Sequence, residues 1–332
     1  MESGDPGRQG HPDEGHGGHG STAAPASRER FTRLDPSATI LKAGAVRKNF
    51  RIIGQANIPP TNPVFDQSLK VNENRRLSSS HFLLTLESDP IAAHARPGQF
   101  LMLRLAASLD PLLRRPMSVC NVVPEEPGIG ARVQVLYKVV GRGTSLLANL
   151  SAGDSLQTLG PLGTPFSVSS PESPPPRALI VAGGIGIAPF PFLVPTLKRS
   201  GWNVTLLYGV RRAEELVHRD WFEAQGVEVL TATEDGSEGR KGTVTPLLEE
   251  ALSAVGGFGV AYACGPNAML KAVSARVNAA GVPCQLSLEG HMGCGIGACL
   301  GCAVPVSRGA DPMYVRVCLE GPTLSAAEVL WD

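Results

Sequence analysis

The chain has 332 residues, enough for two or three domains that each bury a core of their own. Its 30 basic and 30 acidic side chains cancel, so overall charge favours neither nucleic acid nor an anionic membrane surface as a partner. Of the seven cysteines, four gather near the C-terminus, and the other three, Cys120, Cys264 and Cys284, are an odd and scattered set, which argues against a disulfide framework and favours a reducing cytoplasm.

Residues 1–45 are low in aromatic and β-branched side chains and cannot bury enough apolar surface to fold alone. We therefore expect a disordered extension. It contains no basic segment followed by an apolar core, so a secretory signal is not expected. The alternative to a solvated tail is metal binding by His11, His16 and His19, which lie among glycines.

Residues 46–168 show short apolar alternations at 81–86, 99–105 and 133–140, separated by turn residues. Strands at such intervals predict an antiparallel barrel or sandwich. Within it, Arg115-Pro116-Met117-Ser118 places a cation and a hydroxyl on one strand, and the turn 141–145 contains Gly143 and Thr144. Each motif alone is typical of an ordinary strand or turn. Together they suggest a dinucleotide lying across the barrel, because Arg pairs with phosphate and Ser donates to ring nitrogens.

Residues 169–177 are rich in proline and predict a linker. Beyond it, apolar strands alternate with helical stretches, which predicts a doubly wound parallel sheet over residues 178–282. The strands are expected at 179–182, 204–208, 227–230 and 260–263, and the helices near 213–223, 244–255 and 266–280. The uncharged run 178–197 has the length of a membrane span, but its glycines and prolines favour a strand, a turn and a short helix.

Two glycine turns follow strands of this sheet. The first is Gly183-Gly184-Ile185-Gly186-Ile187-Ala188-Pro189, in which a proline suits the first position of a helix whose free amides would face a pyrophosphate. The second is Cys264-Gly265-Pro266. The sheet context favours a nucleotide site at the first turn, although such turns also serve packing alone. The second turn is equally typical of a plain corner with a buried thiol.

The segment 283–332 contains four cysteines in the pattern C-x4-C-x2-C-x15-C, namely Cys294, Cys299, Cys302 and Cys318. This is the ligand spacing of a plant-type [2Fe-2S] cluster. The interspersed glycines allow a loop to wrap the cluster and point amides at its sulfurs. A structural zinc site is the alternative, but zinc usually takes two short C-x2-C type pairs.

The barrel motif 115–118, the turn at Gly143 and Thr144, the loop 183–189 and the corner 264–266 together resemble the ferredoxin reductase superfamily. Within it, the cysteine segment 289–302 resembles electron transfer subunits of class 1B dihydroorotate dehydrogenase. The likeness covers residues from about 46 onward and has no counterpart for residues 1–45. Met117 stands where many broader relatives carry an aromatic residue over the flavin.

The resemblance implies one FAD and one [2Fe-2S] cluster per subunit, with NAD as co-substrate. It assigns FAD to Arg115, Pro116, Met117, Ser118, Leu136, Tyr137, Lys138, Gly143 and Thr144. It assigns NAD to Gly183, Gly184, Gly186, Ala188, Pro189, Cys264, Gly265 and Pro266. Arg211 and Arg212 suit an adenosine ribose or a 2'-phosphate, so the residues alone leave NADP open.

The implied partner is an FMN-containing dihydroorotate dehydrogenase catalytic subunit, in a heterotetramer of two of each, in cytoplasmic pyrimidine biosynthesis. Electrons would pass from FMN through the cluster and FAD to NAD+. No general acid or base is expected from this chain, and Glu289 and His291 are interpreted as hydrogen-bonding or surface residues. A cluster that serves a second protein must lie near the surface, so Ile296, Leu300 and residues 319–331 are candidates for the docking face.

Two other functions remain open at this stage. A diaphorase subunit of a hydrogenase, sulfide reductase or sulfite reductase would use the same FAD and nucleotide modules with another electron partner, but the full set of four cysteines favours the dihydroorotate branch. A redox sensor that reports oxidation through loss of its cluster is the alternative outside enzymes. A sensor needs no hydride donor, so the nucleotide motifs argue against it.

Overall fold

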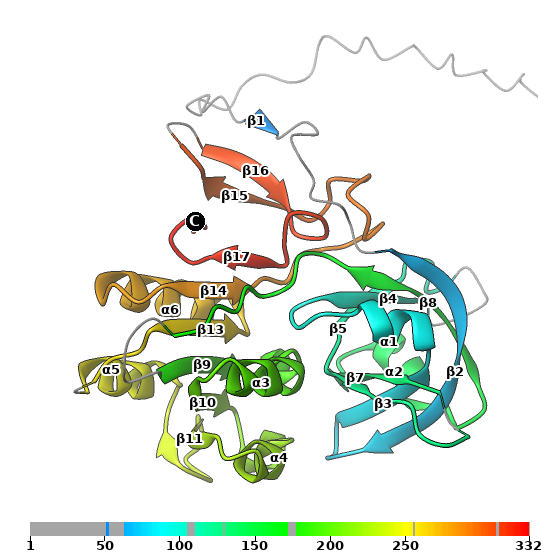
Figure 1. The fold of residues 1–332 in the computed structure, drawn as a ribbon, viewed down its shortest axis with the longest axis horizontal. Coiled ribbons are helices and arrows are strands. Elements are labelled where there is room, and N and C mark those ends of the chain that lie inside the picture. Colours follow the sequence, from blue (N-terminus) through cyan, green and yellow to red (C-terminus); the bar gives the residue numbers. More distant parts are fainter. Residues whose placement is uncertain are drawn as a thin grey trace, which may run out of the picture. The chain divides into compact units, whose positions relative to one another are not determined.

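The computed structural model describes residues 51–52, 63–104, 110–128, 130–171, 177–254, 256–309 and 312–331. The extension predicted at 1–45 lies outside these residues, and so does most of the predicted linker. All the described residues belong to one compact unit that begins at Lys48 (Figure 1). Its three sheets correspond to the barrel, the nucleotide domain and the cysteine segment expected from the sequence.

The first sheet has seven strands, and every neighbouring pair is antiparallel. In spatial order they are β5 (Arg115–Ser118), β4 (Phe100–Arg104), β8 (Ser155–Leu162), β2 (Phe65–Arg76), β3 (His81–Glu87), β7 (Arg132–Lys138) and β6 (Asn121–Val123). The chain passes directly from one end of this order to the other, because β5 and β6 are separated by only Val119 and Cys120. The Val119 amide donates to Gln99 and the Cys120 amide to Gln134, which joins the two ends and confirms the barrel.

Two short helices complete the barrel, α1 (Asp89–His94) and α2 (Arg142–Ala148). The Ser88 hydroxyl accepts a hydrogen bond from the Ile91 amide and so caps the start of α1. At α2 the Thr144 hydroxyl accepts from the Val140 and Gly141 amides and thereby fixes the turn after β7. The Asn74 side chain donates to the Leu147 carbonyl at the other end of α2.

The second sheet is parallel except at one edge, which confirms the doubly wound domain. Its spatial order is β12 (Arg240–Lys241), β11 (Glu228–Thr233), β10 (Asn203–Val210), β9 (Arg177–Gly183), β13 (Val260–Cys264), β14 (Cys284–Ser287) and the antiparallel β17 (Thr323–Ser325). From β9 the chain builds outward through β10 and β11, then returns to β13 on the other side of β9. The strand order therefore reverses between β9 and β13.

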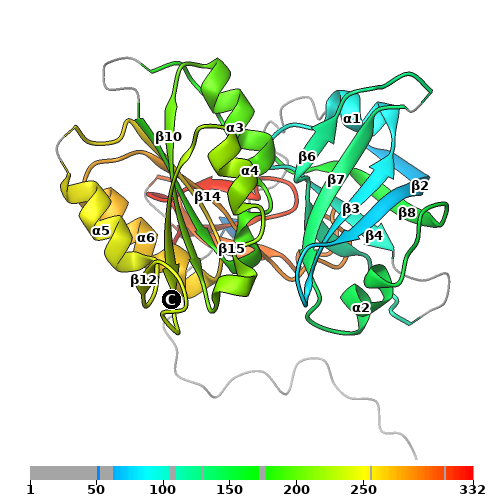
Figure 2. The same ribbon diagram turned by 90° about the horizontal axis from the view of Figure 1, so that it is seen from below.

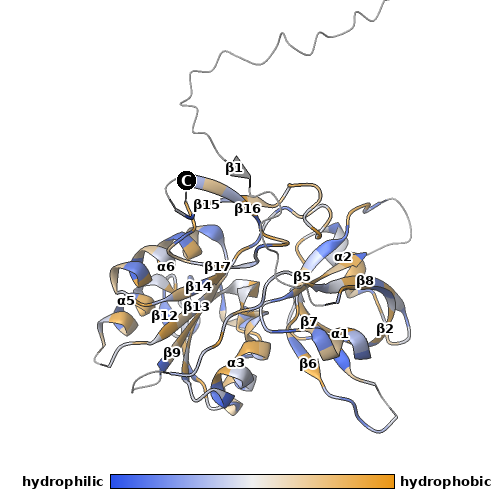
Figure 3. Cartoon of the chain, turned by 45° about the horizontal axis from the view of Figure 1, so that its top comes forward, coloured by the Kyte–Doolittle hydropathy of each residue, from blue (hydrophilic) through white to orange (hydrophobic). Residues whose placement is uncertain are grey.

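Helices cover both faces of this sheet (Figure 2). One face carries α3 (Phe190–Arg199) and α4 (Arg219–Ala224), and the other carries α5 (Thr245–Ser253) and α6 (Asn267–Ala279). Helix α5 shows both hydrophobic and hydrophilic residues in Figure 3, as expected for a helix with one face on a core. A short 3-10 turn, η1 (Gly184–Ile187), separates β9 from α3, so Pro189 occupies the cap position and α3 begins at Phe190.

The helix predicted at 213–223 is wrong as a single element. The structure has a 3-10 turn, η2 (Ala213–Glu215), followed by α4, and His218 between them adopts a left-handed φ of 63°. The Tyr208 hydroxyl donates to the Glu215 carbonyl, which ties η2 to the end of β10. This tertiary contact ends the first turn before a regular helix can continue through residues 216–218.

The third sheet consists of β1 (Arg51–Ile52), β16 (Pro312–Arg316) and β15 (Ala303–Ser307). An apolar cluster joins it to the other two sheets, because Val306 and Val315 belong to the same buried group as Leu286 of β14 and Met102 of the barrel. The cysteine segment is thus part of the folded unit rather than an appendage. In the part of the chain that the structure describes, no helix has the length and apolar character needed to cross a membrane.

Candidate functional site

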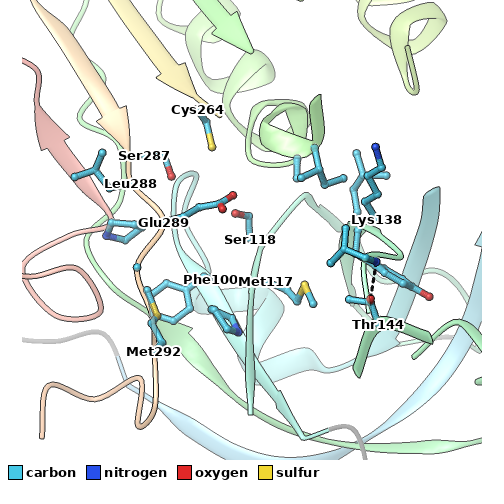
Figure 4. A pocket seen from close by; sticks show the side chains of 18 residues that line it. Phe100, Met117, Ser118, Lys138, Thr144, Cys264, Ser287, Leu288, Glu289 and Met292 are labelled. Atoms are coloured by element: carbon cyan, nitrogen blue, oxygen red, sulfur yellow. Dashed lines mark hydrogen bonds between the residues drawn. The ribbon is translucent and has the colours of Figure 1, made fainter. Parts of the chain in front are cut away.

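A cavity of about 240 Å³ lies between the barrel and the nucleotide sheet (Figure 4). Its barrel wall includes Ser118 of β5 and Lys138 of β7, and its opposite wall includes Cys264 of β13 and Glu289 after β14. Most of its lining is apolar, with a few polar groups in one region. This combination is typical of a site for a largely flat, hydrophobic ligand held by a few directed contacts.

A second cavity, of about 630 Å³, lies over the ends of the parallel strands. It includes the loop after β9 at Gly183, Gly184 and Gly186, and the corner after β13 at Gly265 and Pro266. Four residues line both cavities: Lys138, Val140, Ile185 and Glu289. The two cavities therefore adjoin, and ligands in them would meet at these side chains.

The larger cavity lies where the strand order reverses between β9 and β13, which is where doubly wound sheets bind their ligands. The two corners approach each other closely. A methyl group on Gly186 would lie 2.3 Å from the Cys264 carbonyl oxygen, so glycine is needed for the backbones to pack this way. The sequence motifs 183–189 and 264–266 are thus two sides of one site.

An ion pair links the barrel to the nucleotide domain beside both cavities. The Lys138 ammonium lies 2.7 Å from the Glu215 carboxylate, and both side chains are largely buried, with exposures of 22% and 16%. Although burial alone would raise it, the pKa of Glu215 is lowered by the hydrogen bond and the charge of Lys138. His81 packs nearby. Burial and the Lys138 charge lower its pKa, so the imidazole is neutral at physiological pH.

Polar groups gather at one end of the smaller cavity, where Ser118, Cys264, Ser287 and Glu289 point into the same region (Figure 4). Burial raises the pKa of the Cys264 thiol to about 12, and the nearby Glu289 adds to the shift, so this thiol is neutral. The Glu289 side chain is accessible from the cavity, yet the protein around it desolvates the carboxyl enough to raise its pKa. The interpretation of Glu289 as a local surface residue missed its position in the cavity wall.

The predicted site residues lie as follows. The smaller cavity is lined by Pro116, Met117, Ser118, Leu136, Tyr137, Lys138, Thr144, Ala188 and Cys264. The larger one is lined by Lys138, Gly183, Gly184, Gly186, Gly265 and Pro266. Neither lining includes Arg115, Gly143 or Pro189. The Arg115 guanidinium donates to the Leu113 carbonyl. Roles in binding stay predictions for all of these residues.

Several other lining residues are not among the predicted site residues, including Phe100, Ser287, Gly290, Met292, Glu215 and Glu234. One signal was available for two of them. Ser287 ends the strand β14 beside β13, and Glu234 directly follows β11, so both lie at carboxyl ends of parallel strands. Phe100 and Met292 carry no such pattern, because only the packing of the barrel against the cysteine segment brings them to the cavity.

The four cysteines come together beside this site in two pairs. The side chains of Cys294 and Cys299 hydrogen-bond each other, and so do those of Cys302 and Cys318. Among the described residues no three His, Cys, Asp or Glu side chains are arranged around one metal ion. Two thiol pairs suit a [2Fe-2S] core, since each of its two irons takes two protein ligands.

Backbone amides point at the sulfurs. The Cys294 sulfur accepts from the Ile296, Ala298 and Cys299 amides, at 3.3 to 3.5 Å. The Cys318 sulfur accepts from Gly297 at 3.1 Å, where the glycine has a φ of 79°. Partial burial opposes the effect, but the Ile296 and Cys299 amides lower the pKa of the Cys294 thiol to about 7. The amides that favour the thiolate form of Cys294 suit a cluster ligand, whereas burial and the neighbouring Cys302 raise the pKa of the Cys318 thiol to about 12.

Arg316 supports the loop from outside. Its guanidinium donates to the Gly297 carbonyl at 3.2 Å and pairs with the Glu320 carboxylate. Burial alone would raise it, but the hydrogen bonds from Arg316 lower the pKa of Glu320, so the pair is charged. Gly297 is therefore held at two points: its amide donates to the Cys318 sulfur, and its carbonyl accepts from Arg316.

Comparison with known proteins agrees with this geometry. Residues 289–330 match the family described as the iron-sulfur cluster binding domain of dihydroorotate dehydrogenase B, and residues 180–275 match the oxidoreductase NAD-binding domain. The electron transfer subunit of dihydroorotate dehydrogenase B (NAD(+)) from Desulforamulus reducens is 38% identical over 81% of this chain and 99% of its own length. The subunit of the same name from Caldanaerobacter subterraneus subsp. tengcongensis is 41% identical over 79% of this chain and 97% of its own.

This chain belongs to the family of dihydroorotate dehydrogenase B electron transfer subunits. The expectation of an iron-sulfur segment is thereby confirmed over the zinc alternative. Among solved structures, the NADH-dependent reduced ferredoxin-NADP oxidoreductase of flavin-based electron bifurcation has a TM-score of 0.69. It is 30% identical and covers 80% of this chain and 90% of that one. The predicted ferredoxin reductase fold is confirmed, and the chain is an NAD-linked oxidoreductase component.

Proposed function

We propose that this chain carries electrons from the FMN of a dihydroorotate dehydrogenase catalytic subunit to NAD+, through a [2Fe-2S] cluster and FAD, in pyrimidine biosynthesis in the cytoplasm. The observation that carries the proposal is the adjacency of three sites. The smaller cavity shares four lining residues with the larger one, and Gly290 and Met292 of the cysteine segment form part of its wall. Membership of the family supports the reaction, and the adjacency of the three sites supports the order of the transfer steps.

The smaller cavity suits the ring system of FAD. Its apolar lining excludes water from a flat ring, while the Ser118 hydroxyl supplies a hydrogen bond at the end where Cys264 and Glu289 also point. A bound flavin supplies the exchange between one-electron and two-electron transfer. Burial raises the pKa of Glu289, which lines the cavity beside the proposed ring site.

The larger cavity suits NAD. The corners at Gly186 and Gly265 bring backbone amides to the switch point of the sheet, and the nicotinamide would reach the flavin past Ile185 and Glu289, which line both cavities. Arg211 lines this cavity together with the carboxylates of Glu215 and Glu234. The Glu234 carboxylate disfavours the extra phosphate of NADP, so NAD is the preferred nucleotide.

The exposed face of the cysteine loop suits docking of the FMN-containing catalytic subunit. Ile296 and Leu300 are exposed at 55% and 43% beside the thiols, and Leu300 adopts a left-handed φ of 59°. A leucine in that conformation is strained, and strain of this kind concentrates at functional sites. Trp331, in contrast, is partly buried and packs against the apolar cluster that contains Val306 and Val315.

The reaction is tested by co-expression with a candidate FMN subunit and measurement of dihydroorotate-dependent NAD+ reduction. Cys302→Ser removes one thiol of the buried pair, and Cys120→Ala removes a buried barrel thiol outside the cysteine segment. We expect loss of iron and of dihydroorotate-dependent activity only in the first variant. Full activity of an iron-free Cys302→Ser protein would refute the relay. Co-purification as a heterotetramer of two of each subunit is the expected assembly.

The docking face is tested separately by comparing Leu300→Asp with Leu230→Asp. Both leucines are exposed, at 43% and 39%, but Leu230 lies on β11 in the nucleotide sheet. A buried carboxylate disrupts an apolar interface, so Leu300→Asp is expected to weaken association with the catalytic subunit by about tenfold or more. Equal binding by the two variants in a titration with the catalytic subunit would show that the assigned face is wrong.

A further inference from the structure

The four cysteines differ in exposure in a regular way. Cys302 and Cys318, which form one pair, are 3% and 2% exposed. Cys294 is half-buried and Cys299 is exposed, and these form the other pair. A cluster held by them has one side toward solvent and one side toward the protein interior. The two sides are chemically distinct places for an electron to enter and leave.

The buried side adjoins the smaller cavity through a single glycine. Gly290 lines the cavity, and a methyl group on it would lie 3.2 Å from Cβ of Cys302 and 3.5 Å from Cα of the same residue. A methyl group on Gly290 would therefore point at the buried residue Cys302, while Gly290 itself lines the cavity. A larger residue here would hold Cys302 and a ligand in the cavity farther apart.

Electron tunnelling slows steeply with distance and runs best through well-packed, bonded atoms. A glycine at a contact between two redox groups therefore gives the shortest gap that a polypeptide can provide. The packing also connects Cys302 with the cavity. Cys302 belongs to the apolar cluster that contains Phe100 and Leu288, two further residues of the cavity wall.

We propose that Gly290 is the electron contact between the cluster and the flavin, and that electrons cross it from the Cys302 side after entering from the partner at the Cys294 and Cys299 side. This inference rests on the proposed function. Each electron that crosses leaves the iron-sulfur group oxidised by one electron and the flavin reduced by one. Two crossings and one proton from solvent give the flavin the electron pair and proton that leave as hydride to NAD+.

The test uses the full chain with its cofactors and runs the transfer in reverse. NADH reduces the flavin, and the flavin then passes electrons to the cluster, which is followed by stopped-flow absorbance and by electron paramagnetic resonance. Gly290→Ala and Gly290→Val lengthen the proposed contact by increasing amounts. Gly281→Ala is the control, because Gly281 lies outside the cysteine segment and both cavity linings, and its methyl group would meet no atom within 4 Å.

We expect the two Gly290 variants to slow flavin-to-cluster transfer several-fold, more for valine than for alanine, while flavin reduction by NADH and both midpoint potentials stay unchanged. Gly281→Ala should keep the wild-type internal rate. If the Gly290→Val protein does not bind the cluster, the transfer rate of the Gly290→Ala protein alone tests the proposal. Wild-type internal rates in a cofactor-replete Gly290 variant would overturn the contact. A wild-type chain without iron or flavin would instead overturn the proposed function on which the contact depends.

Discussion

The close approach of the two nucleotide corners makes a strong prediction for Gly186→Ala. The new methyl group would lie 2.3 Å from the Cys264 carbonyl oxygen and 2.7 Å from Cα of Gly265. A carbon and a carbonyl oxygen normally stay about 3.3 Å or more apart, so the backbones must separate by roughly 1 Å. Both neighbours are backbone atoms, which cannot rotate away as a side chain can.

Such overpacking costs about 1 to 3 kcal/mol, and a contact between two backbones falls toward the upper end. The strain is relieved by opening the corners that form the larger cavity. If the bound nucleotide must restore the closed arrangement, its affinity falls by about tenfold for each 1.4 kcal/mol, giving a loss of roughly 10- to 100-fold. We expect this loss in titrations of the FAD-loaded protein with NADH.

The control is Gly281→Ala. Gly281 follows α6, has a φ of 68°, and has no atom within 4 Å of the position that a methyl group would take. Alanine there is strained by its left-handed backbone, at about 1 to 2 kcal/mol, but the site is untouched. This variant should lower thermal stability while keeping NADH affinity. Unchanged affinity in Gly186→Ala would refute the closed corner as a requirement for binding.

Three further outcomes are expected. In a double-mutant cycle of Lys138→Met with Glu215→Gln, followed by urea unfolding, the largely buried pair should show a coupling of about 1 to 3 kcal/mol. Glu289→Gln should match wild-type stability in acid and exceed it at higher pH. The raised pKa of Glu289 favours the folded state below its ordinary value of 4.5, and that advantage is lost as pH rises through the raised value. Iodoacetamide at about pH 8 should leave Cys120 and Cys284 unmodified in the native protein, because burial raises the pKa of each thiol to about 12.

The sequence predicted the parts of the site that depend on local backbone chemistry. Glycines after a buried strand mark a tight turn, so the loop at Gly183 and the corner at Gly265 were identifiable one at a time. The strand 115–118 was likewise readable from its composition, and the structure places three of its residues in the smaller cavity. These features are set within a few residues of each other along the chain.

Contacts between distant segments were not predictable from the sequence. Glu289 follows a strand like many surface carboxylates, and only the pairing of β14 with β13 carries it to the cavity. The helix expected at 213–223 failed for the same reason, since the bond from Tyr208 to Glu215 overrides local propensity. Gly290 differs from the other glycines of its segment only through its contact with Cys302, which no spacing rule encodes.

The cysteine segment is fixed at both of its ends to the same edge of the nucleotide sheet. It leaves that sheet after β14 and returns as β17, which pairs antiparallel with β14. The return also contacts the barrel, because the Thr323 hydroxyl donates to the Thr164 and Pro165 carbonyls. The Leu288 amide, directly after β14, donates to the carbonyl of Pro322, directly before β17.

This closed loop has a consequence for how the three sites work together. A segment held at both ends against the sheet and the barrel cannot shift without disturbing the wall of the smaller cavity, to which both Leu288 and Pro322 belong. The gap between Cys302 and the cavity is therefore set by the fold rather than by the partner. If the partner docks at the proposed face around Leu300, it only has to approach the exposed thiols, and the proposed transfer through Gly290 crosses a distance that the fold sets.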